Sequence, residues 1–147
     1  RLVRNFLPLD VTLRSRGLSF PSRCGCCYLE KEALLHVFLT GLVASEVWRR
    51  VSRHFGFQLR NCSSMASVFV SWYLTSSSSS KNHIRAFMPI VVCWFLWLAR
   101  NQERYQGIRW EVEKIIREVD YFLEQLGRAN KLRWSHFTGM QIVICYD

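Results

Sequence analysis

The sequence predicts a small, mainly α-helical domain with an irregular cysteine-rich loop near its N-terminus. Half of the 147 residues are hydrophobic, and they include ten Phe, six Trp and five Tyr. That content is sufficient for a buried core and argues against a disordered chain. Apolar residues recur at helical spacing in several segments, whereas three of the six cysteines lie between residues 24 and 27.

Two helices are expected in the first 60 residues. Asp10 is suited to cap a short helix over residues 11–16, and Gly17 is suited to end it. The next helix is predicted over residues 43–55, because its apolar residues recur every four positions, and Gly56 follows as a stop signal.

Three further helices are expected after residue 60. Ser63 or Ser64 precedes an aromatic-rich stripe over residues 65–73, and a longer apolar helix is predicted from 84 to 105, ending at Gly107. Pro89 either kinks this long helix or marks its first turn. The most regular stripe covers 110–126, with Gly127 as its stop.

The expected organisation is one helical domain over residues 1–126. It comprises a metal-loop part (7–56) and a helical part (57–126), with a loop at the five-serine run 76–80. Residues 127–147 form a C-terminal tail that contains a short β-prone segment at 140–146. The apolar run 86–99 is too short to span a membrane, so no membrane partner is expected.

Cys24, Cys27 and His36 are spaced as metal ligands. A Cys-x2-Cys turn brings two sulfurs to one point, and the imidazole nine residues later is within reach of it. A closed structural zinc site needs a fourth ligand, and the expected place shortly after His36 is occupied by Thr40 and Gly41. The loop is therefore zinc-knuckle-like with one ligand missing at Gly41.

Several interpretations of this loop remain open. Cys26 sits between two ligands and is expected to point away from the metal. Glu30, Glu32 or Glu46 could reach the metal as a substitute ligand, and Cys62, although distant in sequence, remains a further candidate. Alternatively, Cys24 and Cys27 are small buried residues, His36 is a core histidine, and the site has decayed while the helices keep the fold.

Three motifs occur in order along the chain. The central motif comprises Ser22-Arg23-Cys24, Cys27, Glu30, Glu32, His36-Val37-Phe38, Ala44 and Val47-Trp48. The flanking motifs comprise Leu7-Pro8, Leu13 and Arg16-Gly17 upstream, and Trp94, Trp97 and Arg100-Asn101 downstream. Together they resemble the zinc-binding region of plant non-LTR (LINE-type) retrotransposon reverse transcriptases. The chain departs from that family at Leu9, where the family has Thr, and at Gly41, where it has the fourth Cys.

The resemblance implies a non-catalytic accessory region that belongs to a longer reverse transcriptase polyprotein. Its location would be intracellular, either nuclear or cytoplasmic. Polymerase chemistry needs clustered carboxylates for two metal ions, and the three aspartates, Asp10, Asp120 and Asp147, share no signature. We therefore expect a fragment that lacks the polymerase centre and takes no small-molecule substrate.

Positive charge is concentrated in the first part of the chain. The net charge is +9, and residues 1–60 carry ten Lys or Arg against four Asp or Glu. A basic surface attracts nucleic-acid phosphates, so RNA or DNA is the expected partner. The candidate phosphate contacts are Arg23, Arg49, Arg50 and Arg53. The alternatives are a solvated basic face, and a helical protein-interaction domain or decayed relic with no metal or nucleic-acid ligand.

Overall fold

The computed structural model describes residues 2, 7–18, 23–56, 59, 62–74 and 82–128. Within these ranges the chain is mainly α-helical, as the sequence predicts, and its only β pairing is an isolated antiparallel bridge between Arg23 and Lys31. The serine run 76–80 and the β-prone segment 140–146 lie outside the described residues. None of the described helices is long and apolar enough to cross a membrane.

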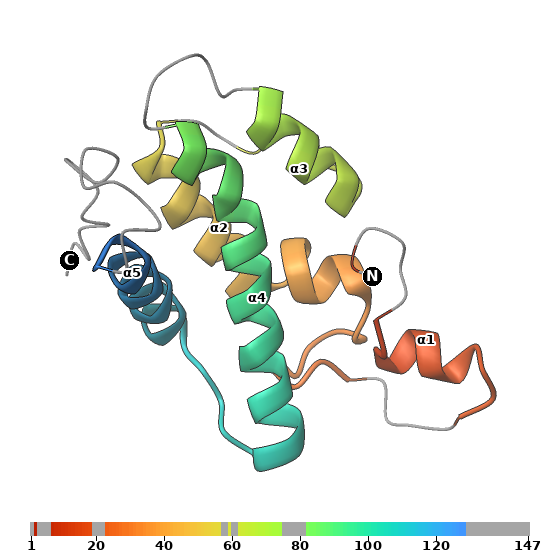
Figure 1. The fold of residues 1–147 in the computed structure, drawn as a ribbon. Coiled ribbons are helices and arrows are strands. Elements are labelled where there is room, and N and C mark those ends of the chain that lie inside the picture. Colours follow the sequence, from red (N-terminus) through yellow and green to blue (C-terminus); the bar gives the residue numbers. More distant parts are fainter. Residues whose placement is uncertain are drawn as a thin grey trace.

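The described helices surround α4, which crosses the middle of the molecule (Figure 1). In chain order they are α1 (Asp10–Arg14), η1 (His36–Thr40, a one-turn π-helix), α2 (Leu42–His54), α3 (Met65–Leu74), α4 (Asn82–Gln106) and α5 (Val112–Arg128). Helices α2, α3, α5 and η1 all contact α4. Residues distant in sequence therefore share one helix as their packing partner.

Local sequence signals explain most helix ends. Ser64 caps α3, because its hydroxyl accepts from the Ser67 N–H at 3.1 Å while the Ser67 hydroxyl accepts from the Ser64 N–H at 3.1 Å. Gly56 and Gly107 follow α2 and α4 with φ of 71° and 66°. This left-handed conformation costs glycine little, so both residues end their helices as predicted.

Three local predictions were wrong. Asp10 does not cap α1; it is the first helical residue, and Leu9 takes the cap position without a side-chain cap bond. Pro89 does not mark a first turn, because α4 already begins at Asn82. Helix α5 continues through Gly127 to Arg128. At Asp10 the buried ion pair with Arg104 outweighs the local capping signal.

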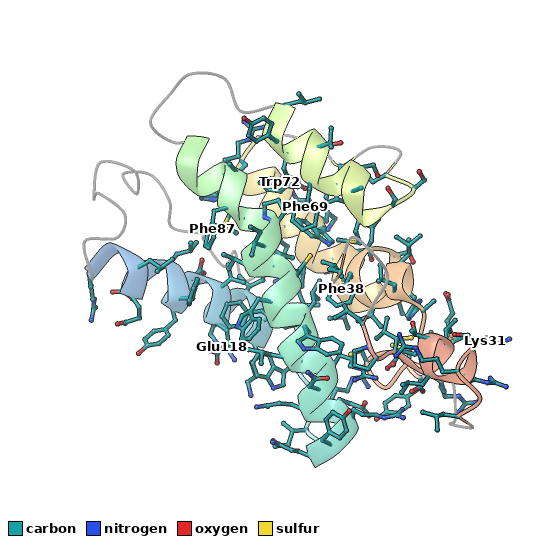
Figure 2. The ribbon with its side chains drawn as sticks, turned by 45° about the vertical axis from the view of Figure 1, so that its right-hand side comes forward. Lys31, Phe38, Phe69, Trp72, Phe87 and Glu118 are labelled. Atoms are coloured by element: carbon teal, nitrogen blue, oxygen red, sulfur yellow. The ribbon has the colours of Figure 1, made fainter. Side chains whose placement is uncertain are left out.

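The core is formed by aromatic and aliphatic side chains from α2, α3, α4 and α5. Trp72 is fully buried, and its ring lies 6.0 Å from that of Trp48 and 5.4 Å from that of Phe55. Figure 2 shows Phe69 and Trp72 on the inner side of α3 and Phe38 beside the middle of α4. On the far side of α4, the rings of Phe95 and Phe122 meet edge to face at 5.9 Å.

A buried charge network joins the segment that carries the metal-binding candidates (residues 24–36, here called the metal loop) to α4. Arg100 donates from Nε and Nη2 to the two oxygens of Glu32, at 3.0 and 2.5 Å, and both side chains are 2% exposed. Burial alone would lower the pKa of Arg100, but the hydrogen bonds to Glu32 reverse this and raise it. Glu32 also accepts the Asp10 backbone N–H at 3.2 Å. The network thus joins α1, the metal loop and α4.

A second ion pair supports the same junction. Arg104, one turn after Arg100, donates to Asp10 Oδ2 at 3.0 Å. The Asp10 side chain is fully buried, so this charge is neutralised inside the protein. Two acidic residues of the N-terminal part are therefore paired with two arginines of α4.

We predict that Arg100→Met lowers the free energy of unfolding by about 3–5 kcal/mol, because it leaves the Glu32 carboxylate buried without its partner. Urea denaturation measures the effect. The double variant Glu32→Leu/Arg100→Met removes both charges and should lose less than Arg100→Met alone. A loss below about 1 kcal/mol for Arg100→Met would contradict a tightly buried pair.

The second prediction concerns Asp120 on α5, where burial raises the carboxyl pKa from 3.8 to about 7. The folded state then holds a proton that the unfolded state has released, so stability falls as pH rises from about 4 to 7. Asp120→Asn cannot titrate. In urea denaturation its stability relative to the wild type should therefore rise across this pH range, and a constant difference would contradict the assignment.

Candidate metal centre

The cysteine loop is held as a tight turn by backbone hydrogen bonds. The Cys24 N–H donates to the Glu30 carbonyl and the Tyr28 N–H donates to the Cys24 carbonyl, both at 2.8 Å. Tyr28 takes a φ of 58°, which is uncommon for a residue with a Cβ. The flanking bridge between Arg23 and Lys31 closes the base of this loop.

The histidine is presented by η1, the π-helix that follows the loop. Its wide turn is closed by the Gly41 N–H donating to the His36 carbonyl at 2.8 Å. The Trp48 indole N–H of α2 donates to the Phe38 carbonyl at 2.6 Å and anchors the turn. Single π-turns are rare and often occur at functional sites. Here the turn directs His36 inward, where it is 6% exposed.

Cys24, Cys27 and His36 converge as the sequence predicts. One ligand atom from each lies within 4.8 Å of the others, and no further such group occurs in the described part of the chain. Cys27 Sγ is 3.2 Å from His36 Nε2. Ligand atoms around a tetrahedral zinc ion are about 3.5–3.8 Å apart, given its usual bond lengths. Two thiols and one imidazole therefore suit zinc in chemistry, and their separations need to change by about 1 Å or less to bind it.

Glu30 lies on the other side of the imidazole. Its Oε2 is 3.2 Å from His36 Nδ1, although the angle falls short of a hydrogen bond. A small rotation of this exposed carboxylate would let it accept the Nδ1 proton. That proton position leaves Nε2 free to bind a metal, which is the arrangement that carboxylates commonly impose on metal-bound histidines.

The three clustered cysteines differ in their electrostatics. A hydrogen bond from the Cys26 thiol, with help from nearby backbone N–H groups and His36, lowers the pKa of Cys24 to about 5 despite its burial. The pKa of Cys26 is raised, first by that same hydrogen bond and then by burial. Cys24 is thus prepared as a thiolate, the form that binds metals. As expected, Cys26 does not belong to the group of ligand atoms that lie within 4.8 Å of one another, although it borders the same small cavity.

The position of the missing ligand is closed by backbone. A Cβ built on Gly41 would lie 3.0 Å from His36 Nε2, so this position does face the metal site. The same Cβ would lie 2.5 Å from the His36 carbonyl oxygen, which is too close for any side chain. Gly41 therefore fits this π-turn, whereas a cysteine would require the backbone to move.

Motif residues of α4 form the support beneath the site. The Trp97 ring stacks on the Phe38 ring with centroids 6.2 Å apart, and the Arg100 guanidinium lies 5.2 Å from the Trp97 centroid. Arg100 in turn binds Glu32 in the metal loop. The central and downstream motifs of the sequence thus meet around one stacked group.

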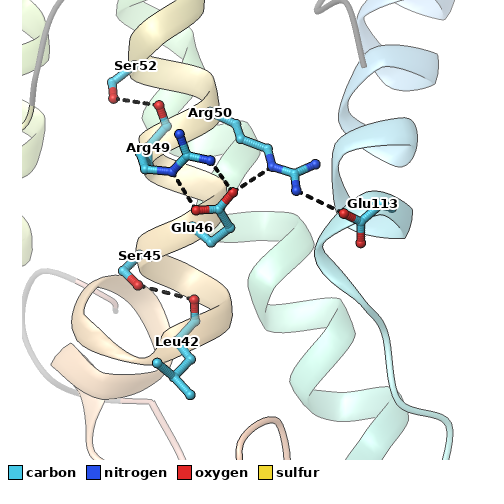
Figure 3. A network of polar contacts seen from close by, with 7 residues as sticks. All are labelled: Leu42, Ser45, Glu46, Arg49, Arg50, Ser52 and Glu113. Atoms are coloured by element: carbon cyan, nitrogen blue, oxygen red, sulfur yellow. Dashed lines mark hydrogen bonds and ion pairs between the residues drawn. The ribbon is translucent and has the colours of Figure 1, made fainter. Parts of the chain in front are cut away.

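The four candidate phosphate contacts are in different environments. Glu46 forms ion pairs with both Arg49 and Arg50, and Arg50 also reaches Glu113 of α5 at 2.9 Å (Figure 3). These arginines lower the pKa of Glu46 to about 2. Arg23 and Arg53 are exposed and form no ion pair among the described residues.

Comparison with known families agrees with the geometry of the loop. Residues 1–48 match the family model described as zinc-binding in reverse transcriptase. The N-terminal third of the chain is therefore similar to a reverse transcriptase zinc-binding region. This region is distinct from the catalytic polymerase domain. The match includes all three metal-binding candidates and ends within α2. Neither a curated protein nor a solved structure gives a significant match.

Sequence reasoning missed two features of this site. The pairing of Glu32 with Arg100 spans 68 positions, and the two residues belong to different motifs, so nothing in the sequence indicated that they meet. The position of Cys26 in the lining of the same cavity as Cys24 and Cys27 was also not expected.

We predict that zinc raises the melting temperature of the wild-type protein and that EDTA reverses the rise, because zinc binds only the folded arrangement. Zinc at 100 times its dissociation constant would add about 2.7 kcal/mol. Cys27→Ser and His36→Ala should lose the response, whereas the control Cys62→Ala, outside the cluster, should keep it. A wild-type protein that purifies without zinc and ignores EDTA would contradict a working site.

Proposed function

We propose that this chain is a zinc-binding, nucleic-acid-binding accessory region of a non-LTR retrotransposon reverse transcriptase, without catalytic activity of its own. The observation that carries the proposal is the convergence of Cys24, Cys27 and His36 inside the segment that matches the zinc-binding family. The rest of the reverse transcriptase polypeptide would be its covalent partner.

The zinc ion would have a structural role. Bound zinc would supply a cross-link between the cysteine loop and η1. Cys24 and Cys27 would bind as thiolates and His36 through Nε2. The surroundings support a closed site, because apolar residues of α2 and α4 line the small cavity at the sulfurs.

Charge distribution supports contact with RNA or DNA. Asp10 and Glu32 are buried and paired with arginines of α4, so they do not offset the positive charge outside. The exposed cations among the described residues 7–56 are Arg14, Arg16, Arg23, Lys31, Arg49 and Arg53, against Glu30 as an exposed acid. Such an excess attracts phosphates over several ångströms.

The ion pairs in Figure 3 leave some of the candidate arginines less available to a phosphate than others. Arg49 and Arg50 share the carboxylate of Glu46, so a phosphate would have to compete with an existing ion pair. Arg23 beside the metal loop and Arg53 near the end of α2 face no such competition. We therefore assign the main phosphate contacts to Arg23 and Arg53.

We predict that binding to single-stranded RNA weakens steeply with salt. Each neutralised phosphate contributes about −0.7 to the slope of log affinity against log salt for a single strand. Arg23→Ala and Arg53→Ala should each reduce the slope by about this amount, as measured by fluorescence anisotropy at several salt concentrations. Arg117→Ala removes an exposed charge from α5 and is the matched control.

Two results would contradict the assignment. Absence of binding at low salt would favour the alternative of a helical domain without a nucleic-acid ligand. If the slope of log affinity against log salt is the same for Arg23→Ala, Arg53→Ala and Arg117→Ala, the binding reflects general attraction to the net charge of +9 and not a defined contact surface.

A further inference from the structure

The cysteine cluster contains a third sulfur that the family pattern does not use. Cys26 lies between the two motif cysteines and is half-buried. Its side chain helps to line the same small cavity as Cys24, Cys27, His36 and Gly41. A structural zinc ion takes four ligands, and the described residues provide three in mutual reach.

The cavity itself restricts what the fourth ligand can be. Its volume is about 10 Å³, near the minimum that one water molecule requires. Apart from the cysteines, the histidine and Gly41, the lining residues are apolar, namely Val37, Leu42, Val43, Ala44, Leu96 and Ala99. A water ligand would find no second polar partner among these side chains, and buried water normally needs two to four.

The position used by the family is also closed. A Cβ at residue 41 would collide with the His36 carbonyl oxygen at 2.5 Å, and that oxygen is held by the Gly41 N–H. A ligand from this position would require the π-turn to open. The fourth ligand must therefore come from another side chain that already faces the cavity.

We propose that Cys26 supplies the fourth ligand, so that the chain binds zinc through Cys24, Cys26, Cys27 and His36. Cys26 lines the same small cavity as Cys24, Cys27 and His36. Its sulfur lies outside the group of atoms within 4.8 Å of one another. A change between staggered rotamers moves a cysteine sulfur by about 3 Å, which is enough to bring it toward the metal. The inference rests on the proposed zinc site.

Zinc binding would deprotonate Cys26. The thiol loses its proton to solvent, and the resulting thiolate binds the metal. Three thiolates and one neutral imidazole leave the zinc site with a charge of −1. Cys3His is an established ligand set for structural zinc, whereas three protein ligands plus water is typical of catalytic zinc.

The test combines cobalt spectroscopy with zinc affinity. Cobalt(II) bound to the wild-type protein should show tetrahedral d–d bands and a sulfur-to-cobalt absorption that Cys26→Ala reduces by about one third, as expected for three thiolates losing one. Zinc affinity, measured by competition with a chelator, should fall at least tenfold in Cys26→Ala. Cys26→His, which offers another ligand, should retain more affinity than Cys26→Ala. Cys62→Ala is the matched control.

The outcomes separate this inference from the proposed function. If Cys26→Ala and Cys62→Ala bind zinc as tightly as the wild type with the same cobalt spectrum, Cys26 is not a ligand, and the zinc site stands without it. If the wild type binds neither metal, both proposals fail. Should Cys26→Ala not fold, X-ray absorption of the zinc-loaded wild type decides, because three sulfurs and one nitrogen support the inference and two sulfurs overturn it.

Discussion

The arrangement of the N-terminal half depends on the buried ion pair between Glu32 and Arg100. Glu32 lies five residues after Cys27 and four residues before His36, so its ion pair fixes the chain between these metal-binding candidates. Arg100 belongs to α4, the helix that contacts most of the domain. Because an unpaired charge at this depth is costly, each partner restricts the other to one position. The metal loop is thereby positioned against a rigid helix despite its own irregular backbone.

This constraint explains how a loop with little regular structure can hold its ligands close together. The Arg100 guanidinium lies beside the Trp97 ring, and this ring also stacks on that of Phe38 in η1. Helix α4 therefore supports η1 as well as the metal loop. The π-turn then directs His36 toward the sulfurs and leaves no space for a side chain at residue 41. Gly41 and Cys26 both border the small cavity beside this turn.

The sequence alone predicted the helical class, because amphipathic stripes and glycine stops report local structure directly. It also predicted the convergence of Cys24, Cys27 and His36, because a short spacing limits where their side chains can lie. It did not predict that Glu32 meets Arg100 across 68 positions, since periodicity carries no information on which helices pack together. The spacing also placed Cys26 outside the ligand group, in agreement with the structure, but did not indicate that Cys26 borders the same cavity. The left-handed conformation of Tyr28 shapes this turn, and spacing rules do not anticipate it.

The most direct test of this account is the zinc affinity of the double variant Glu32→Leu/Arg100→Met. The variant keeps an apolar contact between the loop and α4 but removes the paired charges that fix the loop. Partners outside the ligand set typically contribute 10- to 100-fold to metal affinity, so we expect zinc to bind at least about tenfold more weakly. Zinc binding as tight as that of the wild-type protein would contradict the claim that this ion pair positions the metal centre.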